Sequence, residues 1–248
     1  MIQTSKIIEI EKERYDKMSK TIYLDPGHGG SSSPGAVNGN RLEKNDTLAM
    51  AKAVRGKLVL QGHTVVLTRD GDTNPSLENR IGQANTAGAD IFVSLHRNSH
   101  TDKTAKGIEI WVRYNNHVAA AVAVLEELVK YPHQEANRGV KIGAYKVLYN
   151  AKMPAMLIEL GFISNTEDNR LFDKHFDDYA TAIAKGIVSA LGEQWQILGK
   201  PNLEKPPYRV QVGAFGVKAN AEAFLQSVKN KGLEAFLVAP EEEKAEVE

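Results

Sequence analysis

The chain has 248 residues, of which 42% are hydrophobic and 25% charged, an ordinary composition for a globular protein with one sizeable core and a small appendage. Lysine plus arginine and aspartate plus glutamate number 31 each, so no overall field favours nucleic acid or a membrane as partner. The sequence contains no cysteine, which excludes disulfides and metal sites built on thiolates.

Residues 1–20 lie ahead of the first predicted strand. Charges at Glu9, Glu11 and Lys12 interrupt the apolar core that a secretory signal peptide needs. We therefore expect an N-terminal extension and a protein made in the cytoplasm without a signal peptide. No later run approaches the roughly 18 apolar residues that span a bilayer. A role outside the cytoplasm would then need a separate route of release.

Short apolar runs alternate with helical patterns from Thr21 onward. The runs TIYLD, HTVVLTR and DIFVSLH predict strands, and apolar residues at helical spacing lie between them. The segments GIEIWV, VAAAVAVLEELVK and AMLIELGF continue the alternation, and a last amphipathic helix runs through Ile183 and Leu191. This rhythm predicts an α/β fold with a mostly parallel or mixed twisted sheet and helices on both faces.

The ends of the first two helices carry recognisable signals. Asn45 and Asp46 are candidate N-caps for the first helix. Gly62 and Gly88 are candidate stops for the first and second helices, because glycine readily adopts the left-handed conformation that ends a helix. On this interpretation Glu43 lies in the loop just before the first helix.

The helical and strand pattern breaks in the segment GKPNLEKPPY, whose prolines are typical of a linker. A strand, a helix and a strand follow, beginning with YRVQVGAF and ending with EAFLVAP. We therefore predict an extension at 1–20, a main domain at 21–197, a linker at 198–207 and a small C-terminal βαβ unit at 208–248.

Four ionisable side chains are predicted at one rim of the sheet. His28, His96 and Glu159 each lie at or just beyond the end of a predicted strand, and Glu43 precedes the first helix. Sites in open α/β sheets lie beyond the carboxyl ends of the strands. Two imidazoles and one carboxylate are a recurring zinc set, and the second carboxylate could transfer protons. Spacing alone does not say which glutamate has which role, and a lone histidine at a strand end is more often structural.

The glycines around His28 occur in the stretch YLDPGHGG. A phosphate-binding loop would need G-x-G-x-x-G or a G-K-[ST] ending, and neither is present. The alternative is that the glycines let the backbone turn sharply and leave the imidazole of His28 open to a large ligand.

Together with further motifs, these residues resemble the zinc-dependent N-acetylmuramoyl-L-alanine amidases of the Amidase_3 type. The motifs run in order across about residues 21–195: LDPGHGG, Glu43, SLHRNSH, NRGVK and MPAMLIELGFISN. The resemblance implies hydrolysis of the amide bond between N-acetylmuramic acid and L-alanine in the stem peptide of peptidoglycan. It implies one zinc ion per chain with His28, Glu43 and His96 as ligands, and Glu159 as catalytic acid and base.

The same resemblance makes Asn98, Arg138 and Lys141 candidates for substrate contacts. Either cation could bind a carboxylate of the stem peptide. Arg97 departs from the family pattern, because many relatives have a small residue at this position. The substrate preference of the site near Arg97 is therefore open.

The C-terminal unit resembles half of a SPOR domain, a module that binds the glycan of peptidoglycan. Because a unit of this size buries little core, we expect two tails to pair and make a homodimer; the alternative is a tail that packs on its own main domain or stays disordered.

Two other functions stay open at this point. One is a different zinc hydrolase of peptidoglycan, either a deacetylase or a carboxypeptidase, and the other is a non-catalytic wall-binding protein. For an amidase, the expected setting is the cell wall after release, as a phage endolysin or a sporulation autolysin.

Overall fold

The computed structural model describes residues 19–130 and 136–196, together with Glu222 and Leu225. The chain divides after Gln196, and the fold below is that of the first unit. Residues 1–18 of the expected extension, the expected linker and nearly all of the expected C-terminal unit lie outside the described residues. Within the described part, every helix is too short or too polar to cross a membrane.

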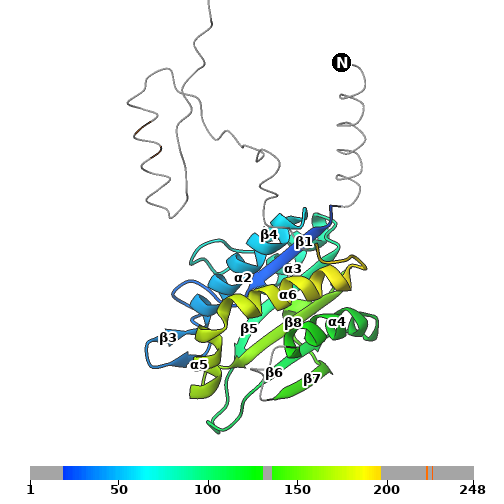
Figure 1. Cartoon of the computed structure of the whole chain (residues 1–248). Helices are drawn as coiled ribbons and strands as arrows, with labels where there is room; N and C mark the ends of the chain where they lie inside the picture. The colour runs from blue at the N-terminus through cyan, green and yellow to red at the C-terminus, as the bar shows by residue number, and fades with distance from the viewer. Residues whose placement is uncertain (1–18, 131–135, 197–221, 223–224, 226–248) are drawn as a thin grey trace, which may run out of the picture. The chain divides into compact units, whose positions relative to one another are not determined.

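A six-stranded sheet forms the centre of this unit, with the strand order β4-β1-β5-β8-β6-β7 (Figure 1). Neighbours from β4 to β8 run parallel, β6 is antiparallel to β8, and β7 is parallel to β6. The predicted mixed, mostly parallel sheet is thus confirmed. The strands span β1 (Thr21–Pro26), β4 (Thr64–Leu67), β5 (Ile91–Asn98), β6 (Ile108–Val112), β7 (Asn137–Ile142) and β8 (Ala155–Phe162).

Helices cover both faces of the sheet, as predicted. On one face Ile22 and Leu24 of β1 belong to a buried apolar cluster shared with α2, α4 and α6, and α5 also contacts β8. On the other face Tyr23 belongs to a second cluster with α3 and η2. Alternate residues of β1 thus pack into the two apolar clusters on opposite faces of the sheet. The helical segments are α2 (Glu43–Leu60), α3 (Leu77–Thr86), η1 (Asn115–His117), α4 (Val118–Val129), η2 (Lys146–Leu148), α5 (Thr166–Lys174) and α6 (Phe176–Ala190).

The start of α2 differs from the prediction, because Glu43 is its first residue and Asn45 and Asp46 lie inside its first turn. A short hairpin of β2 (Val37–Asn38) and β3 (Arg41–Leu42) leads directly into the helix. The backbone N–H groups of Glu43 and Lys44 donate to carbonyl groups of the preceding loop at 3.0 and 3.1 Å. These carbonyls satisfy two of the free donors of the first turn, and no side chain caps the helix.

The ends of α2 and α3 match the prediction. Gly62 and Gly88 follow these helices with φ values of 90° and 63°, which is the left-handed region that glycine enters without strain.

Candidate metal centre and active site

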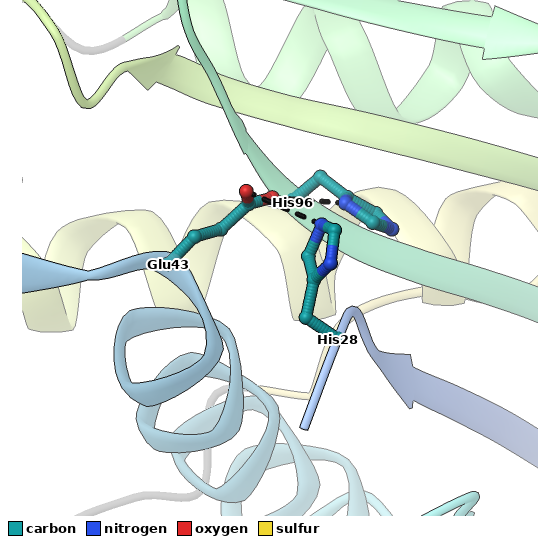
Figure 2. A group of neighbouring side chains, drawn as sticks. All are labelled: His28, Glu43 and His96. Carbon is teal, nitrogen blue, oxygen red and sulfur yellow. Dashed lines mark hydrogen bonds and ion pairs between the residues drawn. The ribbon is translucent and has the colours of Figure 1, made fainter. Parts of the chain in front are cut away.

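Three of the predicted residues converge at the carboxyl end of the central strands (Figure 2). His28 follows β1, Glu43 begins α2, and His96 lies near the end of β5. One ligand atom from each lies within 4.8 Å of the others. His28 Nε2 is 3.2 Å from Glu43 Oε2, and His96 Nδ1 is 2.9 Å from Glu43 Oε1. The structure thus brings together two imidazoles and one carboxylate.

The loop that carries His28 is held in an unusual conformation. His28 has a φ of 62°, a region in which a residue with a side chain is strained. Arg80 donates to the carbonyl oxygen of His28 at 2.9 Å, and Arg69 donates to that of Gly27 at 3.0 Å. Arg80 also bonds the buried carboxylate of Asp25 at 2.8 Å. These buried arginines stabilise the backbone that aims His28 at the cluster.

Two glycines in this region allow the ligands to approach one another. A Cβ on Gly27 would lie 2.3 Å from the ring of His96, and a Cβ on Gly35 would lie 2.6 Å from Glu43 Oε2. Side chains cannot be accommodated at these distances without displacing a member of the cluster. Gly27 of the stretch YLDPGHGG, together with Gly35 outside it, thus permits the close packing of the cluster.

The carboxylate of Glu43 is buried and held by the backbone. Its Oε2 accepts from the N–H of Ala36 at 2.7 Å, and its Oε1 accepts from the N–H of Arg97 at 3.0 Å. Burial opposes its ionisation, but hydrogen bonds from His28 and His96 outweigh burial and bring the pKa of Glu43 well below its usual range. An ionised carboxylate beside two imidazoles is a donor set that suits zinc.

The imidazole of His28 is oriented by a neighbouring side chain. Its Nδ1 lies 3.1 Å from Ser33 Oγ, while its Nε2 faces Glu43. A bond to one ring nitrogen fixes the ring and leaves the other nitrogen for a metal. The residues present therefore fit a zinc ion.

Glu159 lies on β8 beside this cluster. It is opposite His96 in the parallel register of β5 and β8, and it is 8% exposed. Its Oε2 is buried and has no hydrogen-bond partner within the described part of the chain. Burial raises the pKa of Glu159 to about 7, and the negative charges of Glu43 and Glu109 add to this effect against the opposing influence of His96. A buried carboxyl oxygen without a partner, on a group with such a pKa, is typical of functional sites.

A cleft of about 310 Å³ opens beside the cluster. His28 and His96 line it together with Asn74, Leu77 and Val147. The two imidazoles are therefore accessible to a ligand from the surface.

The three predicted substrate-contact residues meet at one buried residue that the sequence analysis missed, Glu109 of β6. Asn98 Nδ2, Arg138 Nε and Lys141 Nζ donate to the Glu109 carboxylate at 2.9, 2.7 and 2.5 Å. The only sequence signal for this residue is one charged position inside the apolar run GIEIWV.

Arg97 is placed in the interior and does not line the cleft beside His28. Its guanidinium group donates to Asp46 at 2.9 Å and to Asn169 at 2.8 Å, and it lies 4.1 Å over the ring of Phe172. The side chain thus connects α2 with α5.

Two protein-family models match parts of the chain. The Amidase_3 model, described as N-acetylmuramoyl-L-alanine amidase, matches residues 22–191, and the SPOR domain model matches residues 204–246. The sporulation-specific N-acetylmuramoyl-L-alanine amidase of Bacillus subtilis (strain 168) is 34% identical over 227 residues, which cover 88% of this chain and 84% of that protein.

Solved structures give the same result. The catalytic domain of CwlV, an N-acetylmuramoyl-L-alanine amidase from Bacillus (Paenibacillus) polymyxa var. colistinus, is 33% identical with a TM-score of 0.67, over 71% of this chain and 99% of that chain. An N-acetylmuramoyl-L-alanine amidase from Clostridium difficile 630 is 35% identical with a TM-score of 0.67, over 70% and 97% of the two chains. The chain therefore belongs to the N-acetylmuramoyl-L-alanine amidase family.

Proposed function

We propose that this chain hydrolyses the amide bond between N-acetylmuramic acid and L-alanine of the peptidoglycan stem peptide, with one zinc ion held by His28, Glu43 and His96. One observation carries the proposal: three ligand atoms lie within 4.8 Å of one another, beside a buried carboxyl group that has no hydrogen-bond partner among the described residues.

Zinc held by these residues would supply a Lewis acid that polarises the amide carbonyl and makes a water molecule more acidic. Glu159 would move the proton. Its Oε2 is free to accept a proton from the attacking water and to donate it to the alanine nitrogen as the bond breaks. Burial raises the pKa of Glu159 to about 7 in the zinc-free chain, and the charge of a bound zinc ion would favour the ionised form that accepts the proton.

The remaining residues of the centre keep these groups in place. Arg80 and Arg69 hold the loop carbonyls at His28 and Gly27, and the backbone of Ala36 orients Glu43. Such fixed geometry lowers the reorganisation that the reaction needs.

The chain acts on the cell wall in this account, after release from the cytoplasm, and the region that matches the SPOR model binds its glycan. The extent of the likeness to the sporulation-specific relative supports a sporulation autolysin over a phage endolysin. Pairing of two tails into a homodimer stays a prediction of the sequence, and the residues concerned lie outside the described part.

Product analysis tests the proposal against the other peptidoglycan hydrolases. The full chain is incubated with purified sacculi, and new N-terminal amines, released amino acids, acetate and reducing sugar ends are measured. We expect new N-terminal alanine without acetate or reducing ends. Release of acetate would indicate a deacetylase, release of C-terminal amino acids would indicate a carboxypeptidase, and no product would indicate a wall-binding protein.

A further inference from the structure

Glu109 is a buried carboxylate that the proposed mechanism does not use. It lies directly opposite Glu159 in the antiparallel pairing of β6 with β8, and its side chain is 4% exposed. Since His96 is opposite Glu159 on the other side, His96, Glu159 and Glu109 form a row across three neighbouring strands. Residues paired across strands direct their side chains to the same face of a sheet.

Four donors surround the carboxylate of Glu109. Asn98 Nδ2 and Trp111 Nε1 donate to its Oε1 at 2.9 and 3.0 Å. Arg138 Nε and Lys141 Nζ donate to its Oε2 at 2.7 and 2.5 Å. Burial opposes ionisation, but hydrogen bonds from Lys141, Arg138 and Trp111 outweigh burial and lower the pKa of Glu109. The residue is therefore a fixed negative charge that holds two cations side by side.

Both cations keep donors for a ligand. Arg138 uses only Nε toward Glu109, its guanidinium carbon lies 5.0 Å over the ring of Phe162, and its side chain is 37% exposed. Lys141 lies 5.1 Å from the ring of Trp111 and is 32% exposed. Arginine has five N–H donors and lysine has three, so most of their donors are not used by Glu109. The two cations and the carboxylate together carry a net positive charge. The exposed side chains of this group are the two cations.

The distance of Glu109 and its two cations from the metal centre decides which part of a bound peptide can reach those cations. Neighbouring strands lie about 4.8 Å apart, so Glu109 lies roughly 10 Å from His96. An extended peptide advances about 3.4 Å per residue. A peptide whose first amide bond lies at the metal centre would bring its second or third residue to the cations.

We propose that Arg138 and Lys141 form a subsite for a carboxylate on the peptide part of the substrate, with Glu109 as the positioning residue. The inference rests on the proposed function, because that function places the first amide of the peptide at the metal centre. Paired, pre-oriented cations suit a carboxylate, which accepts several N–H donors at once.

A matched pair of soluble substrates tests the subsite. The acid substrate is N-acetylmuramic acid joined to a tripeptide that begins with L-alanine, has glutamate next, and keeps its carboxylates free. The amide substrate is the same molecule with those carboxylates converted to carboxamides. For the zinc-loaded full chain we expect kcat/KM about tenfold higher on the acid, chiefly through KM, because a hydrogen bond between charged groups contributes about that factor.

Arg138→Gln should bring the ratio of acid to amide close to one, and Glu109→Gln should lower it by raising KM for the acid. Arg55→Gln is the control. Arg55 is about as exposed as Arg138 and also pairs with a carboxylate, that of Asp70, but it lies in the second half of α2. It should keep the wild-type ratio. If the ratio is the same in the wild type and Arg138→Gln, the subsite is overturned while the proposed function stands. If the wild type cleaves neither substrate, the proposed function fails and the subsite with it.

Discussion

Glu159 lies directly opposite His96 in the parallel register of β5 and β8, so a buried carboxyl group stands beside a candidate metal ligand without joining the ligand cluster among the described residues. In the proposed mechanism His96 would hold the metal while Glu159 moves a proton. Three substitutions can separate these roles.

We predict that Glu159→Gln keeps the fold and the zinc but lowers kcat by about 10²- to 10⁴-fold, the range typical of lost acid–base catalysis. His28→Ala and His96→Ala should instead weaken zinc binding by more than about 100-fold, since even loss of an outer partner of a ligand costs 10- to 100-fold. Zinc content after gel filtration measures metal binding, and kcat on a soluble muropeptide measures catalysis. An empty site in Glu159→Gln would show that this division of roles is wrong.

The pKa of Glu159 has a consequence for stability in the zinc-free protein. The folded chain retains this proton up to about pH 7, whereas an unfolded chain loses it near its usual value of 4.5. Between these values the folded state binds more protons, so the free energy of unfolding falls as the pH rises. The destabilisation is complete about one pH unit above the pKa of the folded state and amounts to roughly 3 kcal/mol.

Zinc-free Glu159→Gln should therefore be more stable than the zinc-free wild type at pH 8 and about equal to it at pH 4. Urea unfolding at the two pH values measures the difference. Glu126→Gln, on the exposed surface of α4, is the matched control and should show no such pH dependence. A gain of the same size at pH 4 would rule out the protonation argument.

Gly27→Ala should disrupt the metal centre, because its Cβ would lie 2.3 Å from the ring of His96. We expect zinc affinity to fall by at least about tenfold, as for displaced outer partners of a ligand. Gly56→Ala is the control, since Gly56 lies within α2 and a Cβ there meets nothing within 4 Å. It should bind zinc normally and gain roughly 0.5 kcal/mol of stability. Zinc titration of both variants checks this, and normal binding by Gly27→Ala would contradict the packing argument.

His28 and His96 could be placed from strand ends, since they follow β1 and lie near the end of β5, whereas Glu159 lies inside β8 and Glu43 is the first residue of α2 rather than part of the loop before it. The start of α2 could not be predicted from side chains, since backbone carbonyls of the preceding loop satisfy the first turn. The strand β7 was missed because NRGVKI at the sheet edge has no alternating apolar pattern. Glu109 was missed because its role depends on the register of β6 against β8, which brings it beside Glu159.

Truncation after Gly199 should leave hydrolysis of soluble muropeptides intact but weaken the binding of sacculi. The region that matches the SPOR model lies in the removed part, and a second binding region raises the local concentration of enzyme on an insoluble polymer. Pull-down with purified sacculi measures binding, and equal recovery of both chains would exclude this role. Light scattering on the same two proteins tests the predicted pairing of tails, which requires a dimer of the full chain only.

Zinc reconstitution tests whether hydrolysis depends on a zinc ion bound by His28, Glu43 and His96. The full chain is stripped with a chelator, dialysed, and titrated with zinc while hydrolysis of a soluble muropeptide is followed by the appearance of N-terminal alanine. We predict no activity in the stripped protein and a linear recovery that ends at about one zinc per chain, with no recovery in His96→Ala. Full activity in the metal-free protein would contradict it.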